Sequence, residues 1–164
     1  YLIDVRFSAL GPQQTLAMVK KLYSIPEELS LDLRPMTKGD VFGVAKLLNE
    51  GLRTSPSIQQ NVVKFHYTDE EVKHYLLPRD KVIYTYVISK TENDNGKKKV
   101  KVTDFLSFYS LPSHVMNNPK HNMLYVTLPD PGLHSFYNFA TTVPYTELIR
   151  NALILAKKEG FDVY

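Results

Sequence analysis

Two runs of β-branched and aromatic residues place the strongest constraint on the fold. They span residues 82–88 and 100–109, and the polar stretch between them ends in Asn95-Gly96. Side chains of these types pack well on a pleated sheet, and an Asn-Gly pair suits the tight turn of a hairpin. The pattern therefore predicts two antiparallel strands joined by a hairpin whose tip lies at Asn95-Gly96.

A capping box at Thr37 to Asp40 marks the start of a helix. In such a box the hydroxyl and the carboxylate satisfy free backbone amides at the first turn. Apolar residues recur at helical spacing after the box and predict one buried face, made of Val41, Val44, Ala45, Leu48 and Leu52. Residues 53–64 are rich in Ser, Gln and Asn without a clear period, which predicts a long loop.

A second capping box runs from Thr68 to Glu71. Tyr67 and Val72 occupy the two positions of a hydrophobic staple, which fixes how the chain enters a helix. Pro78 cannot continue that helix and restricts the residue before it, so we predict a helix of about ten residues here.

Apolar spacing predicts two further helices. The first spans residues 15–23 and is closed by Pro26. The second has Pro144 in its first turn and Gly160 as its left-handed terminator. Its buried face is expected to carry Leu148, Ala152, Leu155 and Ala156.

Alternating or β-rich segments predict the remaining strands, at residues 2–7, 31–36 and 134–142, with another strand starting at Phe161. After the strand at residues 2–7 and the short helix at 15–23, the order from residue 31 onward is strand, helix, helix, strand, strand, strand, helix, strand. This order predicts an α+β fold in which helices pack on a mostly antiparallel sheet.

Composition excludes several functional classes. The 164 residues are 43% hydrophobic and 23% charged, as expected for one folded domain, and the net charge of +3 is too small to indicate a nucleic-acid partner. The absence of cysteine excludes a disulfide framework and a cysteine nucleophile, and it favours a cytoplasmic location. No stretch is apolar for long enough to span a membrane. Because the chain starts with Tyr1 and not Met, we expect a piece of a longer protein.

Common catalytic and metal-binding motifs are missing. His114, His121 and His134 lack the close spacing of zinc ligands and are separated by sequence that we expect to be loop, so we predict no metal site. Ser113 follows Leu111-Pro112 without the flanking glycines of a nucleophile elbow. The seven glycines are scattered and form no phosphate cradle. The lysines at 97–99 and 101 are expected to be a solvated hairpin edge.

The segment 102–113 carries the most informative pattern. Strict alternation would place on one face Asp104, Leu106, Phe108 and Ser110, and on the other Thr103, Phe105, Ser107 and Tyr109, so that each face mixes aromatic and polar groups. Together with Ser135-Phe136-Tyr137-Asn138, this indicates an aromatic cleft that could hold an extended peptide or an apolar ligand. The alternative is a pair of core strands whose tyrosine hydroxyls reach solvent.

At these residues the chain resembles the eukaryotic N-myristoyltransferases, also called glycylpeptide N-tetradecanoyltransferases. The resemblance runs from about Leu2 to the end of the chain. It is carried by Leu33-Arg34-Pro35-Met36, by Glu70-Glu71-Val72-Lys73-His74 with Leu77-Pro78, by residues 102–113 and Ser135 to Asn138, and by residues 152–157 followed by Gly160-Phe161-Asp162-Val163.

The resemblance implies an acyltransferase that moves myristate from the co-substrate myristoyl-CoA to the N-terminal glycine of a protein. It also implies two acetyltransferase-like (GNAT) halves. Residues 1–164 are similar to the C-terminal half, incomplete at both ends, which supplies much of the peptide groove. The half that binds acyl-CoA is then a missing partner, and the fragment alone is expected to bind no cofactor and to be inactive.

Matching residue to residue, the resemblance implies a peptide pocket lined by Phe7, Tyr109, Ser113, Leu124, His134 and Val163. No catalytic residue is expected in this chain, because the family's general base is the carboxylate at the mature C-terminus.

Two departures from the family concern the floor of this pocket. His134 stands where the family commonly has tyrosine, and residues 125–133 form a longer segment than usual. The alternative function is a non-catalytic GNAT-like module that binds peptides or other partners without acyl transfer.

Overall fold

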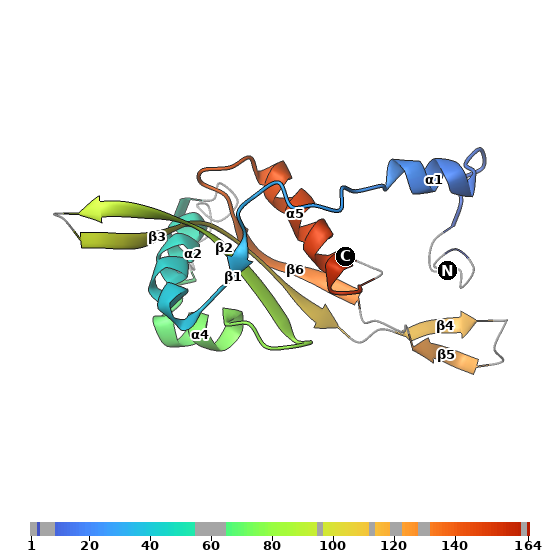
Figure 1. Cartoon of the computed structure of the whole chain (residues 1–164). Helices are drawn as coiled ribbons and strands as arrows, with labels where there is room; N and C mark the ends of the chain where they lie inside the picture. The colour runs from blue at the N-terminus through green and yellow to red at the C-terminus, as the bar shows by residue number, and fades with distance from the viewer. Residues whose placement is uncertain are drawn as a thin grey trace.

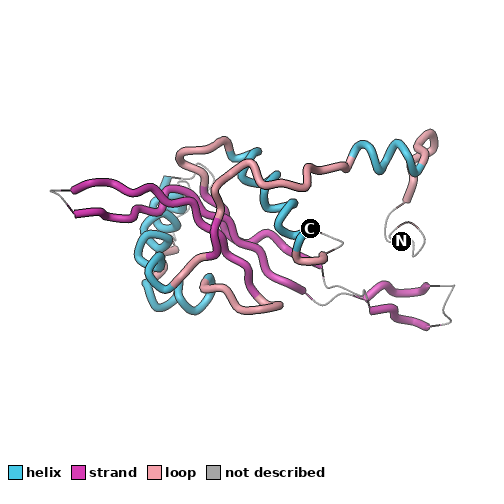
Figure 2. The backbone as a smooth tube through the Cα atoms, viewed as in Figure 1, coloured by secondary structure: helices cyan, strands magenta, loops and turns pink. Residues whose placement is uncertain are grey.

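A four-stranded antiparallel sheet organises the computed structural model, which describes residues 3, 9–54, 65–94, 97–111, 114–118, 123–127, 132–161 and 164. Its strands are β1 (Arg34–Pro35), β2 (Ile83–Asp94), β3 (Lys97–Leu111) and β6 (Gly132–Phe139), in the order β1-β2-β3-β6. Helices cover both faces of this twisted layer (Figures 1 and 2). The predicted α+β class with a mostly antiparallel sheet is therefore confirmed.

Strands β2 and β3 form the predicted hairpin, with pairing from Ile83↔Tyr109 to Asp94↔Lys97. Both strands are longer than predicted, because the ladder continues into the charged residues and pairs Glu92 with Lys99. This distal part extends beyond α2 as a two-stranded ribbon (Figure 1). The predicted tip at Asn95-Gly96 lies outside the described residues, as do the predicted strand at 2–7 and most of the predicted loop at 53–64.

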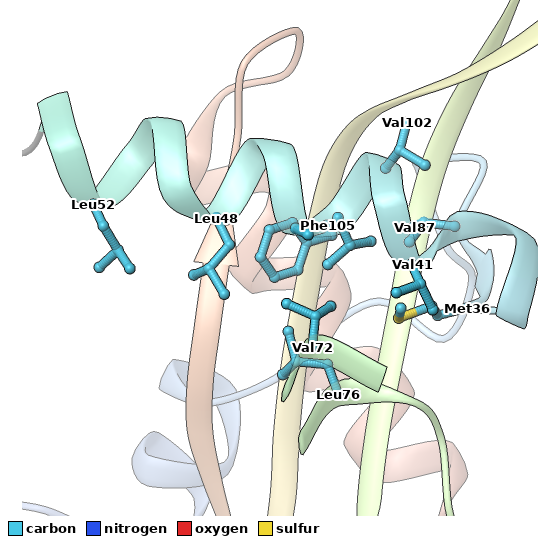
Figure 3. Packing of buried hydrophobic residues seen from close by; sticks show 11 residues of the cluster. Met36, Val41, Leu48, Leu52, Val72, Leu76, Val87, Val102 and Phe105 are labelled. Carbon is cyan, nitrogen blue, oxygen red and sulfur yellow. The ribbon is translucent and has the colours of Figure 1, made fainter. Parts of the chain in front are cut away.

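One face of the sheet is covered by α2 (Val41–Thr54), which follows the short 3-10 helix η1 (Lys38–Asp40), and by α4 (Asp69–Leu76). Both predicted capping boxes are present. The five apolar residues predicted for the buried face of α2 are all buried. Figure 3 shows Leu48 of α2 and Val72 of α4 pointing toward Phe105 of β3.

Helix α2 can approach the sheet closely because Gly51, which has no side chain, faces Phe139 of β6. A Cβ at Gly51 would lie 1.5 Å from Cε1 of Phe139, so no larger residue fits without movement. The start of the helix is fixed by Asp40, whose carboxylate accepts two hydrogen bonds of 2.7 Å from Arg34 and one of 2.8 Å from the Thr37 amide. These bonds lower the pKa of Asp40 to about 2.

The opposite face is covered by α5 (Tyr145–Lys158), whose predicted apolar residues are buried. Gly160 has a φ of 88° and ends the helix as predicted. Asn151 of α5 accepts hydrogen bonds from the amides of Ser30 and Leu31, and so holds the segment before β1. Strand β1 is shorter than the strand predicted at residues 31–36. Only Arg34–Pro35 pair with β2, while the segment before them is held by Asn151.

Three elements differ from expectation or lie apart from this core. Helix α1 (Leu16–Leu22) forms as predicted but buries no residue. The hairpin of β4 (His114–Asn118) and β5 (Met123–Thr127) replaces an expected loop, and Figure 1 shows it beyond the end of the main sheet. Phe161 and Tyr164, the described residues of the predicted last strand, are not in a strand. No helix of the described residues has the length and apolar character needed to cross a bilayer.

Candidate functional site

Five aromatic rings form a continuous row on the face of the sheet that also carries α2 and α4. We call this row the aromatic stripe. The Tyr109 and His134 rings stack at 5.5 Å, Phe136 meets Tyr109 edge-on at 5.6 Å, and Phe136 lies 4.6 Å from Tyr137. Tyr67, just before α4, ends the row with an edge contact of 5.7 Å to Tyr137. These centroid distances are those of favourable aromatic pairs.

Strand register brings the first two rings of the stripe together. Tyr109 of β3 pairs directly with His134 of β6, so their side chains project on the same face. The ladder is irregular between Leu106 and Phe108, where two residues of β6 lie opposite Ser107. This bulge lets the consecutive residues Phe136 and Tyr137 both join the stripe.

The bulge is held by the buried side chain of Ser107. Its hydroxyl accepts a hydrogen bond from the Tyr137 amide and donates one to the Tyr137 carbonyl, both at 3.0 Å. The Ser107 amide donates to the Asn138 side chain at 3.0 Å, and Asn138 donates in turn to Ser135 at 2.6 Å. These bonds satisfy the backbone groups that the irregular ladder leaves unpaired.

The rings at one end of the stripe are more exposed than the aromatic residues in the core part of β3. Phe105 and Phe108 are fully buried, with 0% exposure, whereas Phe136 is 36% exposed and His134 is exposed. Tyr109 is intermediate. Residues 105–108 are therefore core, as the second alternative from the sequence expected, whereas the half-buried Tyr109 joins a row whose other end is exposed; the aromatic cleft stays a prediction.

The strict alternation predicted for residues 102–113 is wrong at its start. A second irregularity, at Ile88/Ser89, shifts the pairing so that Ser89 lies opposite Val102 and Ile88 opposite Asp104. As a result Val102 and Phe105 pack in the same core cluster, although alternation would place them on opposite faces.

The two buried carboxylates of the described residues are both occupied by internal hydrogen bonds. Asp40 binds Arg34 and Thr37, as above. Asp104 accepts from the amides of Thr141 and Thr142, at 2.6 and 2.8 Å, and from the Thr142 hydroxyl at 2.5 Å. Burial alone would raise the pKa of Asp104, but these bonds outweigh it and lower the pKa. Both carboxylates hold the fold together and face no open site.

The stripe offers ring faces, an imidazole and hydroxyl groups, a set that suits binding better than bond cleavage. Among the described residues, no three His, Cys, Asp or Glu side chains are grouped as metal ligands. The predicted pocket residues Tyr109 and His134 meet here. Leu124 lies on β5, in the second sheet. The other three predicted pocket residues, Phe7, Ser113 and Val163, lie outside the described residues.

Tyr67 is the member of the stripe that sequence reasoning assigned only to a helix staple. Its partner Tyr137 is 70 residues away, and no local pattern announces such a pairing. It does pack against the core cluster that contains Val72, in keeping with the staple.

Sequence comparison relates the chain to known proteins over nearly its whole length. Residues 4–164 match the family described as myristoyl-CoA:protein N-myristoyltransferase, C-terminal domain. The chain is 42% identical over 164 residues to a probable glycylpeptide N-tetradecanoyltransferase of Caenorhabditis elegans, covering 99% of this chain and 32% of that protein. It is 41% identical to the glycylpeptide N-tetradecanoyltransferase of Plasmodium falciparum (isolate 3D7), covering 99% of this chain and 35% of that protein.

Structural comparison agrees. The crystal structure of the Saccharomyces cerevisiae N-myristoyltransferase with bound myristoyl-CoA superposes with a TM-score of 0.70 at 25% identity, covering 98% of this chain and 38% of that one. A structure of the same yeast enzyme with myristoyl-CoA and inhibitors gives a TM-score of 0.71 at 26% identity, again covering 98% and 38%. The chain thus spans about a third of its curated relatives. It belongs to the N-myristoyltransferase family and corresponds to the C-terminal domain of that family.

Proposed function

We propose that this chain is the peptide-recognition part of an enzyme that transfers myristate from myristoyl-CoA to the N-terminal glycine of proteins. The family match over residues 4–164 is the observation that carries the proposal. Since the chain spans about a third of its relatives, the reaction is assigned to the parent enzyme and not to these residues alone.

In this reaction the glycine nitrogen forms an amide bond with the acyl carbon, the carbon–sulfur bond to CoA breaks, and a base takes the proton that the amine loses. The chain's buried carboxylates are unsuited to act as that base, because their oxygens already accept internal hydrogen bonds. The resemblance to the family implies that the base is a carboxylate in another part of the parent enzyme. The described residues bind and orient the peptide so that its amine can reach the thioester.

The aromatic stripe supports a peptide-binding role because His134 and Phe136 are exposed and because its side chains can both pack against a ligand and hydrogen-bond to it. We further propose that Phe7, Ser113, Leu124 and Val163 complete the pocket around Tyr109 and His134. We propose a cytoplasmic location for the parent enzyme, in keeping with the absence of cysteine from these 164 residues.

The test uses the full-length parent enzyme and the 164-residue chain side by side, each mixed with myristoyl-CoA and a peptide that begins with glycine. Release of CoA thiol and peptide mass report acyl transfer, and a matched peptide beginning with alanine is the control. We expect the parent to acylate only the glycine peptide and the isolated chain to give no turnover.

Two results would contradict the proposal. Turnover by the isolated chain would show that the catalytic groups lie within it. Peptide binding by the parent without any acyl transfer would favour the alternative, a non-catalytic peptide-binding module.

A further inference from the structure

The backbone of Tyr67, just before α4, is held in place by a side chain of α2. The Asn49 side chain on α2 donates to the Tyr67 carbonyl at 2.8 Å and accepts from the Tyr67 amide at 2.8 Å. A two-way clamp of this kind fixes both the position and the direction of the backbone at that residue. The Tyr67 backbone is therefore tied to the helix that packs on the core, and its side chain packs against the same core cluster.

The fixed ring is joined to the stripe by a hydrogen bond between two hydroxyls. Tyr67 Oη and Tyr137 Oη lie 2.7 Å apart, and the two rings meet edge-on. Burial, followed by this bond, raises the pKa of Tyr137 to about 12, so its hydroxyl stays protonated at neutral pH. The bond therefore persists at neutral pH.

Ring contacts connect this bond to the exposed end of the stripe. Tyr137 stands against Phe136, which meets Tyr109, which stacks on His134. On the other side, the Tyr137 backbone is held by Ser107. With the backbone fixed, the remaining freedom of Tyr137 is rotation of its side chain, and the hydroxyl bond to Tyr67 limits it.

We propose that Tyr67 is a positioning residue for peptide recognition: through its hydroxyl bond to Tyr137 it sets the orientation of the rings that the peptide meets. The inference rests on the function proposed above. It assigns a role in substrate affinity to a residue that itself lies at the far end of the stripe from His134.

The experiment compares three variants of the full-length parent enzyme, Tyr67→Phe, Tyr137→Phe and the double variant, each of which removes the same bond and keeps both rings. A hydrogen bond of this type contributes about 0.5–1.5 kcal/mol, which corresponds to roughly a 2–10-fold change in an equilibrium constant. We expect KM for the glycine peptide to rise by that factor, with kcat and KM for myristoyl-CoA unchanged. The double variant should show the same rise as either single variant.

Tyr145→Phe serves as the matched control, because Tyr145 is 55% exposed on α5 and lies outside the stripe. A lower melting temperature with an unchanged peptide KM would reduce Tyr67 to a structural role and overturn the proposal. So would a double variant in which the two effects add. If Tyr67→Phe does not fold, an unchanged peptide KM in Tyr137→Phe would still overturn the proposal, because that variant removes the same bond.

The proposed function can fail separately. If the unmodified parent gives no turnover, the acyltransferase assignment is wrong, and the same variants are then compared by peptide Kd from fluorescence anisotropy. An equal Kd in all of them would overturn the role of Tyr67 as well.

Discussion

The protein contains two groups of aromatic rings on opposite faces of one sheet. The ring cluster consists of Tyr84, Tyr86, Phe108, Phe161 and Tyr164, and α5 covers it. The aromatic stripe has similar residue types and similar ring distances, yet its free end is exposed.

The difference in exposure between the two groups comes from the helices that cover them and not from the types of ring. Helices α2 and α4 cover the sheet around Phe105, and the stripe continues beyond the residues of that core cluster. Because burial of apolar area stabilises a fold while exposed rings remain available to a ligand, the ring cluster should govern stability and the stripe should govern recognition.

The largest expected effect separates the two groups by stability. Phe108→Ala removes a fully buried ring that contacts Tyr84, Tyr86 and Tyr164. It should lower the free energy of unfolding by about 3–5 kcal/mol, measured by urea denaturation of the chain. Phe136→Ala, in the stripe, should cost less than about 1.5 kcal/mol because that ring is partly solvated already. Equal losses in the two variants would contradict the division.

The next effect concerns acid stability of the face that carries the stripe. Asp40 has its pKa lowered from 3.8 to about 2, chiefly by the hydrogen bonds from Arg34, and at about 1.4 kcal/mol per pH unit this contributes about 2 kcal/mol. Because the folded-state pKa is the lower one, that contribution is complete above about pH 5 and disappears as the pH falls through about 2.

Asp40→Asn should therefore destabilise the chain by about 2 kcal/mol at neutral pH and flatten the loss of stability between about pH 4 and 2. Urea denaturation at several pH values measures both effects. Asp80→Asn is the matched control, since Asp80 is exposed. An unchanged acid profile in the Asp40 variant would show that another carboxylate dominates acid unfolding.

Local signals in the sequence predicted much of the scaffold. The capping boxes at Thr37 and Thr68 act within one helical turn, so they could be recognised without knowing the tertiary structure. The β2–β3 hairpin was equally local. The β4–β5 hairpin was missed because its first strand, His114–Asn118, carries two asparagines and little β-branched content.

The stripe was only partly predictable because it depends on long-range register. The pattern around Tyr109 indicated an aromatic cleft, and Tyr109 and His134 do meet. Their contact, however, requires the pairing of β3 with β6, and the neighbouring Phe136 and Tyr137 share a face only because of the bulge at Ser107. A bulge shifts register by one residue, and no periodic pattern records it in advance.

A smaller effect tests recognition directly. Tyr109→Ala in the parent enzyme removes the ring that contacts both His134 and Phe136. We expect KM for the glycine peptide to rise about tenfold, equivalent to about 1.4 kcal/mol, with KM for myristoyl-CoA unchanged. Steady-state kinetics with each substrate varied in turn measures the two constants. If KM for the peptide and KM for myristoyl-CoA rose together, Tyr109 would stabilise the folded enzyme and would not act specifically in peptide recognition.

The smallest effect is expected from a hydroxyl of the ring cluster. Tyr86 donates a hydrogen bond of 3.2 Å to Glu159 at the end of α5, and burial raises the pKa of Tyr86, so the hydroxyl remains the donor at neutral pH. Tyr86→Phe should lower the free energy of unfolding by about 0.5 kcal/mol, the low end for such a bond because Glu159 is exposed. Peptide KM should not change, in contrast to Tyr67→Phe. If Tyr86→Phe raised peptide KM as well, the sheet would be transmitting changes from one face to the other, and the separation of stability from recognition would not hold.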